Sequence, residues 1–355
     1  MEKTEPRFQA FKKNLQRIPI FILAALGLIG LLSWSRDAFG MNVFWVSRIL
    51  DTTSNFAAVF LGIFIEAAPF LLMGTLASGF VEFFFKPEDL ARLLPRNKIT
   101  AVLTGSLLGL FFPVCECGSV PLARRLMRKG LPVSVGVAFL LAAPVINPIV
   151  IASTLAAFGS GQIFWLRIGL TLLIATITGI IFSFDTDPKG ILRSTNTHSE
   201  SETLTGHFPG INQGLENVSL GKRLKGMMVV AGDEFFEMGR YLIIGAMLAA
   251  LMQTFIPQTL LLSVGQGPIL SVVVLSLLAV VLSICSTVDS FIALAFTGTF
   301  TNGAILAFLV FGPMVDIKAF FMYVRVFQRR PVVYLVVLPF LLILVAGVLI
   351  NLLAG

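Results

Sequence analysis

The sequence predicts an all-α polytopic membrane protein with about seven full spans, two re-entrant helical hairpins and two inverted repeats. Of its 355 residues, 56% are hydrophobic and 13% are charged, whereas soluble globular chains carry about 25% charged residues. Three cysteines cannot form a fully paired disulfide framework, which excludes a secreted, disulfide-stabilised fold. The net charge of +7 lies between apolar runs rather than on one folded face, so we expect no nucleic acid partner.

Seven apolar runs are long enough to cross about 30 Å of hydrocarbon, which takes about 20 helical residues. The first run follows several basic residues, as in a signal peptide, but the sequence at 33–36 is a poor cleavage site. We therefore interpret this run as an anchor that stays in the protein. The seven runs are residues 18–34, 56–85, 131–158, 162–184, 232–255, 302–324 and 332–353.

Two further apolar stretches, 100–129 and 268–300, are interrupted by Pro, Gly, Ser and Cys at 113–121 and 283–290. Each stretch either crosses the membrane once or enters and returns. Lys and Arg in short loops stay cytoplasmic, and an inside amino terminus with two re-entrant hairpins places most basic residues on that side. If both stretches crossed, the basic segments at 124–129 and 189–225 would move outside, so we favour hairpins.

The expected organisation has four parts. Residues 1–55 form a cytoplasmic tail, the first span and an external loop, and residues 56–184 form repeat 1 with its hairpin at 100–129. Residues 185–231 are polar, contain both histidines, and form a flexible cytoplasmic linker. Residues 232–355 form repeat 2 with its hairpin at 268–300.

The two repeats are predicted from three pairs of similar segments. Glu66 to Gly74 (EAAPFLLMG), Cys115 and the segment APVIN that ends at Asn147 all recur about 170 residues later, as EMGRYLIIG, Cys285 and GPMVD. Three full spans, an odd number, lie between corresponding points, so the halves have opposite orientation. Inverted repeats with broken helices are typical of secondary transporters, whose sites lie near the bilayer midplane. Because non-helical backbone cannot face lipid, the two breaks must be buried or line a wet pathway.

Cys115-Glu116-Cys117-Gly118 is the most unusual motif. Residues 118–121 look like the start of the returning half-helix, whose N-terminal dipole favours thiolate at Cys117. Thiolates suit Cu(I), Zn²⁺ or a thiophilic metalloid, and Cys285 would complete a three-sulfur site if the hairpin tips meet. The alternative is that these cysteines are small apolar fillers.

Ionisable side chains inside the spans need partners or a function, because each acid costs about 2.5–3.5 kcal/mol on insertion. Lys318 is too deep to reach the interface easily, so we expect it to pair with an acid or to line the path, although i and i+2 spacing on a helix separates it from Asp316. Asp289 either caps the second half-helix or serves in coupling. Gly74 and Gly245 are expected to serve packing. The candidate coupling residues are Glu66, Glu116, Glu237 and Asp289, and those expected to line the path are Asn147, Asp316 and Lys318.

Three segments carry a resemblance to a known family: 111–121 (FFPVCECGSVP), 143–148 (APVINP) and 285–293 (CSTVDSFIA). From about residue 56 onward the chain resembles the ArsP/YraQ-like family of predicted bacterial permeases, some of which export trivalent organoarsenicals. The resemblance implies a permease more strongly than it implies arsenic, and its motifs fall on Cys115, Cys117 and Asp289. Ser290 stands where a small apolar residue is expected.

The leading hypothesis is a permease of the bacterial inner membrane that exports a thiophilic solute, with Cys115 and Cys117 as ligands and no enzymatic activity. No P-loop motif occurs, so an ion gradient or a partner must supply the energy. One alternative is a membrane thiol oxidoreductase that uses the same two cysteines, and another is a scaffold for a protein that docks on the 185–231 linker. No resident cofactor is expected; the expected partners are the bilayer, the solute, a cytoplasmic protein on the linker and a second copy of the chain.

Overall fold

The computed structural model describes residues 44–84, 95, 97–112, 114–184, 192, 220–255 and 267–354. The chain divides into two units, Met1–Asn55 and Phe56–Gly355, and the packing and the site described below lie within the second. The described residues are almost entirely helical: they contain two isolated bridges, one of them joining Leu192 to Phe327, and no longer strand. The all-α fold class is therefore confirmed.

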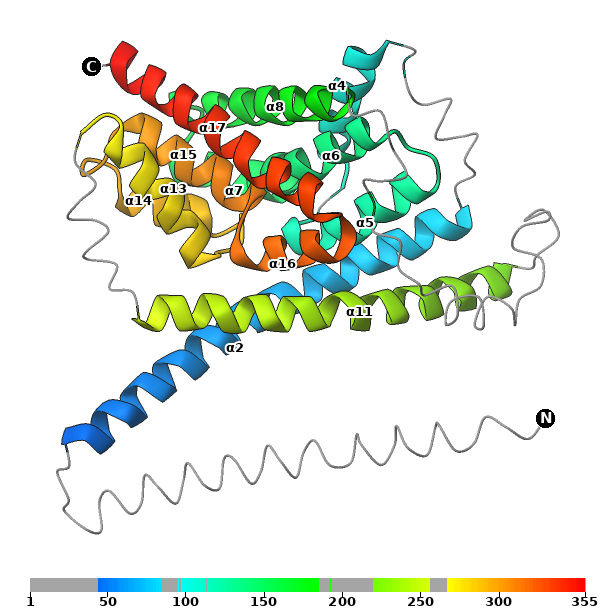
Figure 1. The fold of residues 1–355 in the computed structure, drawn as a ribbon, viewed down its shortest axis with the longest axis horizontal. Helices are drawn as coiled ribbons and strands as arrows, with labels where there is room; N and C mark the ends of the chain where they lie inside the picture. Colours follow the sequence, from blue (N-terminus) through cyan, green and yellow to red (C-terminus); the bar gives the residue numbers. More distant parts are fainter. Residues whose placement is uncertain are drawn as a thin grey trace. The chain divides into compact units, whose positions relative to one another are not determined.

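Twelve helices make up the described part of the chain (Figure 1). They are α2 (Phe44–Phe84), α4 (Lys98–Leu108), α5 (Glu116–Arg128), α6 (Val133–Ile146), α7 (Pro148–Phe158), α8 (Gln162–Phe182), α11 (Leu220–Phe255), α13 (Leu270–Leu282), α14 (Asp289–Ala295), α15 (Asn302–Met314), α16 (Ile317–Val326) and α17 (Arg329–Ala354).

Five helical segments are long and apolar enough to cross a membrane, and a sixth follows if the bent pair α6–α7 counts as one span. These six coincide with six of the seven spans expected from the sequence; the remaining one, 18–34, lies outside the described residues. The chain is thus a multi-pass membrane protein.

Both interrupted stretches break as expected. Helix α4 has 11 residues and α13 has 13, so each is about 16 to 20 Å long and too short to cross the hydrocarbon alone. A non-helical segment follows each helix and leads into a short one, α5 or α14. Pro113 in the first break lies outside the described residues.

The core of the second unit consists of α6 and α15, which pack against each other and are buried over nearly their whole lengths. Helices α4 and α8 pack on α6, and α13 and α17 pack on α15. The short helices cross between these groups, since α5 packs against α16 and α14 against α7. Elements of the two halves of the sequence are therefore interleaved.

Three expected boundaries are corrected. Helix α11 begins at Leu220, so residues 220–231 are helical rather than linker, and α2 begins at Phe44 within the segment expected to hold an external loop. Helix α5 begins at Glu116, two residues before the expected start, so Pro121 lies inside it. Pro121 has no N–H, so the intrahelical bond to the Cys117 carbonyl one turn back cannot form.

The spans broken near Asn147 and Asp316 have the same local structure. The Asn147 side chain accepts a hydrogen bond from the Val150 N–H at 2.9 Å and caps α7, with Pro148 as the first helical residue. The Asp316 side chain accepts from the Ala319 N–H at 2.6 Å and caps α16. A new helix therefore begins at each break, and its N-terminus lies inside the protein.

Candidate functional site

The three cysteines meet in the interior. Cys115 caps the beginning of α5, Cys117 lies in its first turn, and Cys285 lies in the break after α13. The Cys115 thiol lies close enough to the thiols of Cys117 and Cys285 to interact with both. All three are free thiols, and they are 3%, 0% and 3% exposed. Cys285 lies near this pair but outside the compact group that Cys115 and Cys117 form with Glu116, so its role as a third sulfur ligand stays a prediction.

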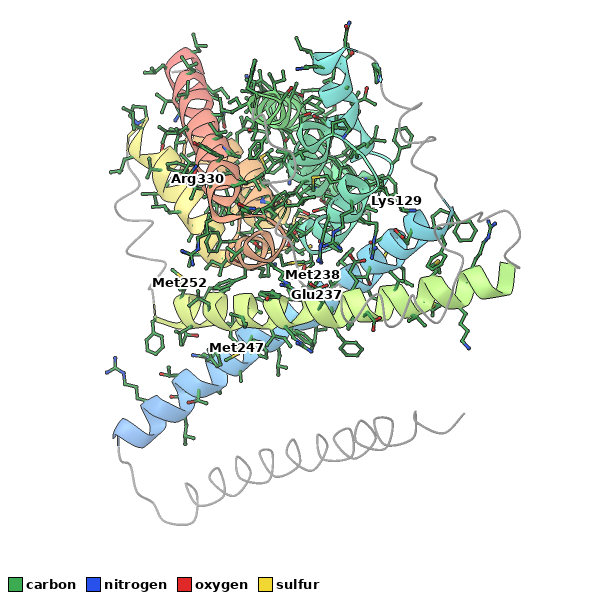
Figure 2. The ribbon with its side chains drawn as sticks, turned by 45° about the vertical axis from the view of Figure 1, so that its right-hand side comes forward. Lys129, Glu237, Met238, Met247, Met252 and Arg330 are labelled. Atoms are coloured by element: carbon green, nitrogen blue, oxygen red, sulfur yellow. The ribbon has the colours of Figure 1, made fainter. Side chains whose placement is uncertain are left out.

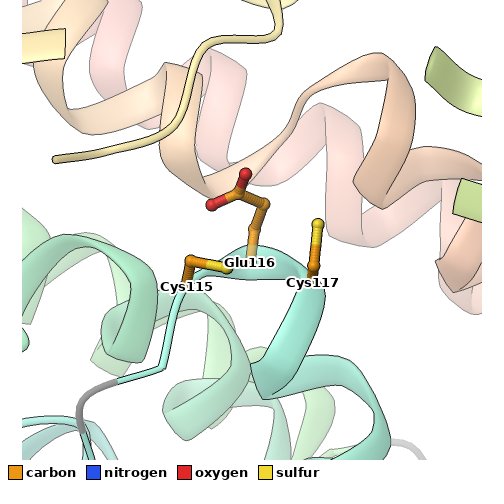
Figure 3. Close-up of side chains that lie close together, drawn as sticks. All are labelled: Cys115, Glu116 and Cys117. Atoms are coloured by element: carbon orange, nitrogen blue, oxygen red, sulfur yellow. The ribbon is translucent and has the colours of Figure 1, made fainter. Parts of the chain in front are cut away.

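Glu116 lies between the two cysteines of the motif (Figure 3). One carboxylate oxygen and the sulfurs of Cys115 and Cys117 lie within 4.8 Å of one another. In Figure 3 the Glu116 and Cys117 side chains extend to the same side of α5. The group offers two sulfur atoms and one oxygen to a metal ion, within a buried first turn of helix.

Lys318 provides the positive charge of the site. Its Nζ lies 3.1 Å from Glu116 Oε1 and 3.3 Å from Asp316 Oδ2, and all three side chains are buried. The expected pairing with an acid is thus observed. The expectation that spacing separates Lys318 from Asp316 is wrong, because Asp316 is an extended N-cap outside the helix and the i, i+2 rule does not apply to it.

Two contacts hold the Cys115–Cys117 turn in position. The Asn147 side-chain amide donates to the Val114 carbonyl at 3.1 Å, directly before Cys115. On the other side, α2 approaches so closely that a Cβ added at Gly74 would lie 2.2 Å from the Gly118 Cα. Asn147 therefore acts on the site through the backbone, and the expected packing role of Gly74 agrees with this contact.

The second half of the chain offers a matching contact and a further acid. A Cβ at Gly245 of α11 would lie 2.8 Å from the Lys318 Cα, so α11 packs on the first turn of α16 as α2 packs on that of α5. Glu66 of α2 lies close enough to Cys285 and Lys318 to interact with both. Glu66 thus belongs to the same cluster.

Asp289 lies apart from the thiols, in a second buried cluster. Arg167 of α8 holds its carboxylate with two hydrogen bonds, Nη2 to Oδ2 at 2.7 Å and Nη1 to Oδ1 at 3.2 Å. The same guanidinium donates to the hydroxyls of Thr154 and Ser290, both at 2.8 Å. The N-cap of α14 is Val288, so the expectation that Asp289 caps this helix is wrong. The Asp289 carboxylate pairs with Arg167 instead.

Glu237 also lies outside the thiol cluster. It pairs with Arg124 of α5 at 3.1 Å and with Arg325 of α16 at 2.7 Å. Figure 2 labels Glu237 and Met238 on α11 and Lys129 at the end of α5. Nearby, Arg125 and Lys129 pair with acids of α2 and α11, so these charges form one network among four helices.

Arg167 is the residue that sequence reasoning missed. The sequence did carry a signal for this residue. Arg167 lies within the apolar run 162–184, and a charged side chain inside such a run needs a partner. The hydroxyl of Ser290, the departure from the family pattern, is one of its ligands. Among the described residues, Arg167 and Lys318 are the two cations buried most completely.

Comparison with known proteins finds one family model and two similar proteins. A family model described as "Predicted permease" (ArsP_1) matches residues 52–352. The chain is 43% identical over 291 residues to the UPF0718 protein YcgR of Bacillus subtilis, covering 82% of this chain and 94% of that protein. It is 38% identical over 275 residues to a Streptococcus mutans protein described as a putative two-component membrane permease complex subunit, covering 77% and 87%.

No solved structure matches the chain significantly. The family match spans both halves of the sequence, including both breaks and the buried charges between them. It therefore includes every residue of the thiol cluster and of the Arg167 cluster. The chain belongs to the ArsP_1 family of predicted permeases.

Proposed function

We propose that this permease is a secondary transporter that exports a thiophilic solute, such as a trivalent organoarsenical or a soft metal ion. The observation that carries the proposal is the meeting of Cys115, Cys117 and Cys285 in the interior, at two helix breaks from different halves of the chain. The thiols lie beside the buried charges of Glu116, Asp316 and Lys318, whose desolvation is costly, and cysteines that only filled space would need no such charges. A solute-binding role accounts for both the thiols and the charges.

An inverted repeat is part of the proposal. In each half a long helix is followed by a short helix, a break, a half-helix, a broken span and a final span; α2, α4, α5, α6–α7 and α8 correspond to α11, α13, α14, α15–α16 and α17. The packing of α5 on α16 and of α14 on α7 has the reciprocal form that two exchanged halves would give. The paired N-caps and the paired glycine contacts support the same interpretation.

The solute would bind where the halves meet, and rocking of one half against the other would expose it to each side in turn. Cys115, Cys117 and Cys285 would bind it, and Asp316 and Lys318 would face it. Glu66 and Glu116 are the coupling candidates closest to the thiols. Asp289 and Glu237 are held by arginines, so their proposed contribution to coupling is through the conformational change rather than at the solute.

The remaining proposals concern location and partners. We place the chain in the bacterial inner membrane, with a cytoplasmic amino terminus and cytoplasmic linker at 185–219, on the distribution of Lys and Arg. The Streptococcus mutans relative is described as a subunit of a two-component permease complex. A second protein that docks on the linker, or a second copy of this chain, would correspond to such an assembly.

A thiol oxidoreductase is the second candidate, favoured by the contact between Cys115 and Cys117. A disulfide between residues only two apart is strained, and both thiols are buried away from a soluble electron donor. This candidate predicts a change in thiol labelling with redox state and no solute flux. The transporter predicts flux that is insensitive to the redox state of the donor pool.

The deciding experiment measures efflux of a trivalent methylated arsenical and of Zn²⁺ from cells that express the parent or the Cys115→Ser/Cys117→Ser variant at equal membrane levels. Export by the parent that the double variant loses is the expected result. Full export by the double variant would refute the thiol site. Export of neither solute by either chain would refute the proposed substrate classes while leaving the permease assignment in place.

A further inference from the structure

We infer that the solute is a thiophilic divalent cation and that the Glu116 carboxylate is its third ligand, beside the sulfurs of Cys115 and Cys117. This inference rests on the proposed function and narrows its substrate class. Of the two solute classes proposed above, it favours the metal ion over the neutral arsenical, because the arsenical binds sulfur and makes no use of a carboxylate.

The geometry suits a metal ion. In a tetrahedral site with metal–sulfur bonds of 2.3 Å, neighbouring sulfur atoms lie about 3.8 Å apart, and the three candidate ligand atoms already lie within 4.8 Å of one another. Three consecutive residues at the start of α5 supply them: the N-cap Cys115 and the first two helical residues, Glu116 and Cys117. The turn itself is fixed by the close contact of Gly118 with Phe70 and Gly74.

One ligand atom has nothing else to bind. Glu116 Oε2 is buried and has no hydrogen-bond partner among the described residues, while Oε1 accepts from Lys318. An unsatisfied buried polar atom costs about 1–3 kcal/mol, and more when its group is charged. A cation bound by this oxygen and the two sulfurs removes that cost, whereas a solute bound by sulfur alone leaves it in place.

The charges around Glu116 also favour a cation as the solute. Two acids, Glu116 and Asp316, share the single ammonium group of Lys318. By contrast, Asp289 has an arginine to itself and Glu237 has two. With Glu66 the cluster holds three acids and one ammonium group, and this excess of acids favours the approach of a cation.

The atoms and protons released on binding differ between a divalent cation and a neutral arsenical. A divalent cation that binds Cys115 and Cys117 as thiolates displaces two protons to water, so the net charge of the cluster is unchanged and Glu116 gains a direct metal–oxygen bond. A neutral dihydroxyarsine condenses with the same two thiols, forms two As–S bonds and releases two water molecules. The carboxylate of Glu116 takes part only in the first reaction.

The test uses the purified full-length chain in detergent, with Cd²⁺ and phenylarsine oxide as probes. Cd²⁺ binding is followed by thiolate-to-metal charge-transfer absorbance. Glu116→Gln, which keeps the shape of the side chain, is expected to weaken Cd²⁺ binding at least about tenfold, with unchanged absorbance per bound Cd²⁺ and unchanged affinity for phenylarsine oxide. Glu82→Gln, an acid-to-amide change in the Arg125–Lys129 network, is the matched control and should alter neither.

Two results would overturn the inference. Unchanged Cd²⁺ affinity in Glu116→Gln would show that the carboxylate is not a ligand, and an equal loss of both probes would show that Glu116 acts only through the local fold. Glu116→Asp, which keeps the charge, covers the case in which the amide variant does not fold: it should retain Cd²⁺ binding better than Glu116→Ala. Equal affinities in these two variants would also contradict the assignment.

Transport in vesicles separates this inference from the proposed function. If the parent moves neither probe but Cd²⁺ binding still depends on Glu116, the transport proposal fails and the ligand assignment stands. If the parent exports a probe through Cys115 and Cys117 while Glu116→Gln binds Cd²⁺ as the parent does, transport stands and the ligand assignment fails.

Discussion

The contact between Gly74 and Gly118 gives a sharp test of how the thiol turn is positioned. In Gly74→Ala the new Cβ would lie 2.2 Å from the Gly118 Cα. Since carbon atoms pack at about 3.5 Å or more, α2 and the start of α5 must separate by about 1.3 Å. Overpacking of this kind costs about 1–3 kcal/mol. The shift falls on the helical turn that carries Cys115 and Cys117, so solute binding should weaken along with stability.

The matched control is Gly62→Ala, twelve residues earlier in the same helix, where an added Cβ meets nothing within 4 Å. Alanine favours helix over glycine by about 1 kcal/mol at both positions, so this gain cancels in the comparison. Thermal unfolding in detergent and Cd²⁺ affinity are measured for both variants. Gly74→Ala should be less stable than Gly62→Ala by about 1–3 kcal/mol and should bind Cd²⁺ more weakly. Equal stability and equal affinity would refute the positioning argument.

Three further predictions concern buried polar groups, each measured by thermal unfolding of the purified chain. Arg167→Gln should lower the free energy of unfolding by about 3–5 kcal/mol because it leaves Asp289 buried and unpaired. Adding Asp289→Asn to the same chain should recover much of that loss, and strictly additive effects of the two changes would contradict the pairing. Lys318→Met should cost a similar 3–5 kcal/mol because two acids lose their shared cation, and Lys318→Arg should cost less. Tyr323→Phe removes the hydrogen bond to the Met314 carbonyl and should cost about 1–3 kcal/mol without altering Cd²⁺ affinity.

The elements with strong local signals were predicted well from the sequence. Apolar length alone located the six described spans, because the hydrocarbon thickness fixes how many residues a helix needs. The two interruptions were equally clear, since Pro, Gly, Ser and Cys within an apolar stretch disfavour continuous helix. Comparison of the halves also placed Asn147 and Asp316 at equivalent breaks, and both are N-caps.

The partners of the buried charges could not be predicted, because they depend on which helices meet. Lys318 pairs with Glu116 across 202 positions of the sequence, and Arg167 with Asp289 across 122. A repeat offset aligns a residue with its counterpart, not with the residue it contacts. This explains why Glu66 and Glu237, matched in the alignment, have different surroundings: one lies beside Cys285 and the other between two arginines.

The two buried ion pairs also constrain how the halves can move. Lys318 on α16 holds the acid at the start of α5, and Arg167 on α8 holds the acid at the start of α14, so each half-helix is tied to the other half of the chain. Separating either pair without replacement costs about 3–5 kcal/mol. A rocking motion must therefore carry each half-helix along with its partner, or supply a substitute charge as the contact opens. At Glu116 the solute cation proposed above would be such a substitute, whereas Asp289 has no thiol beside it and is better suited to remain paired.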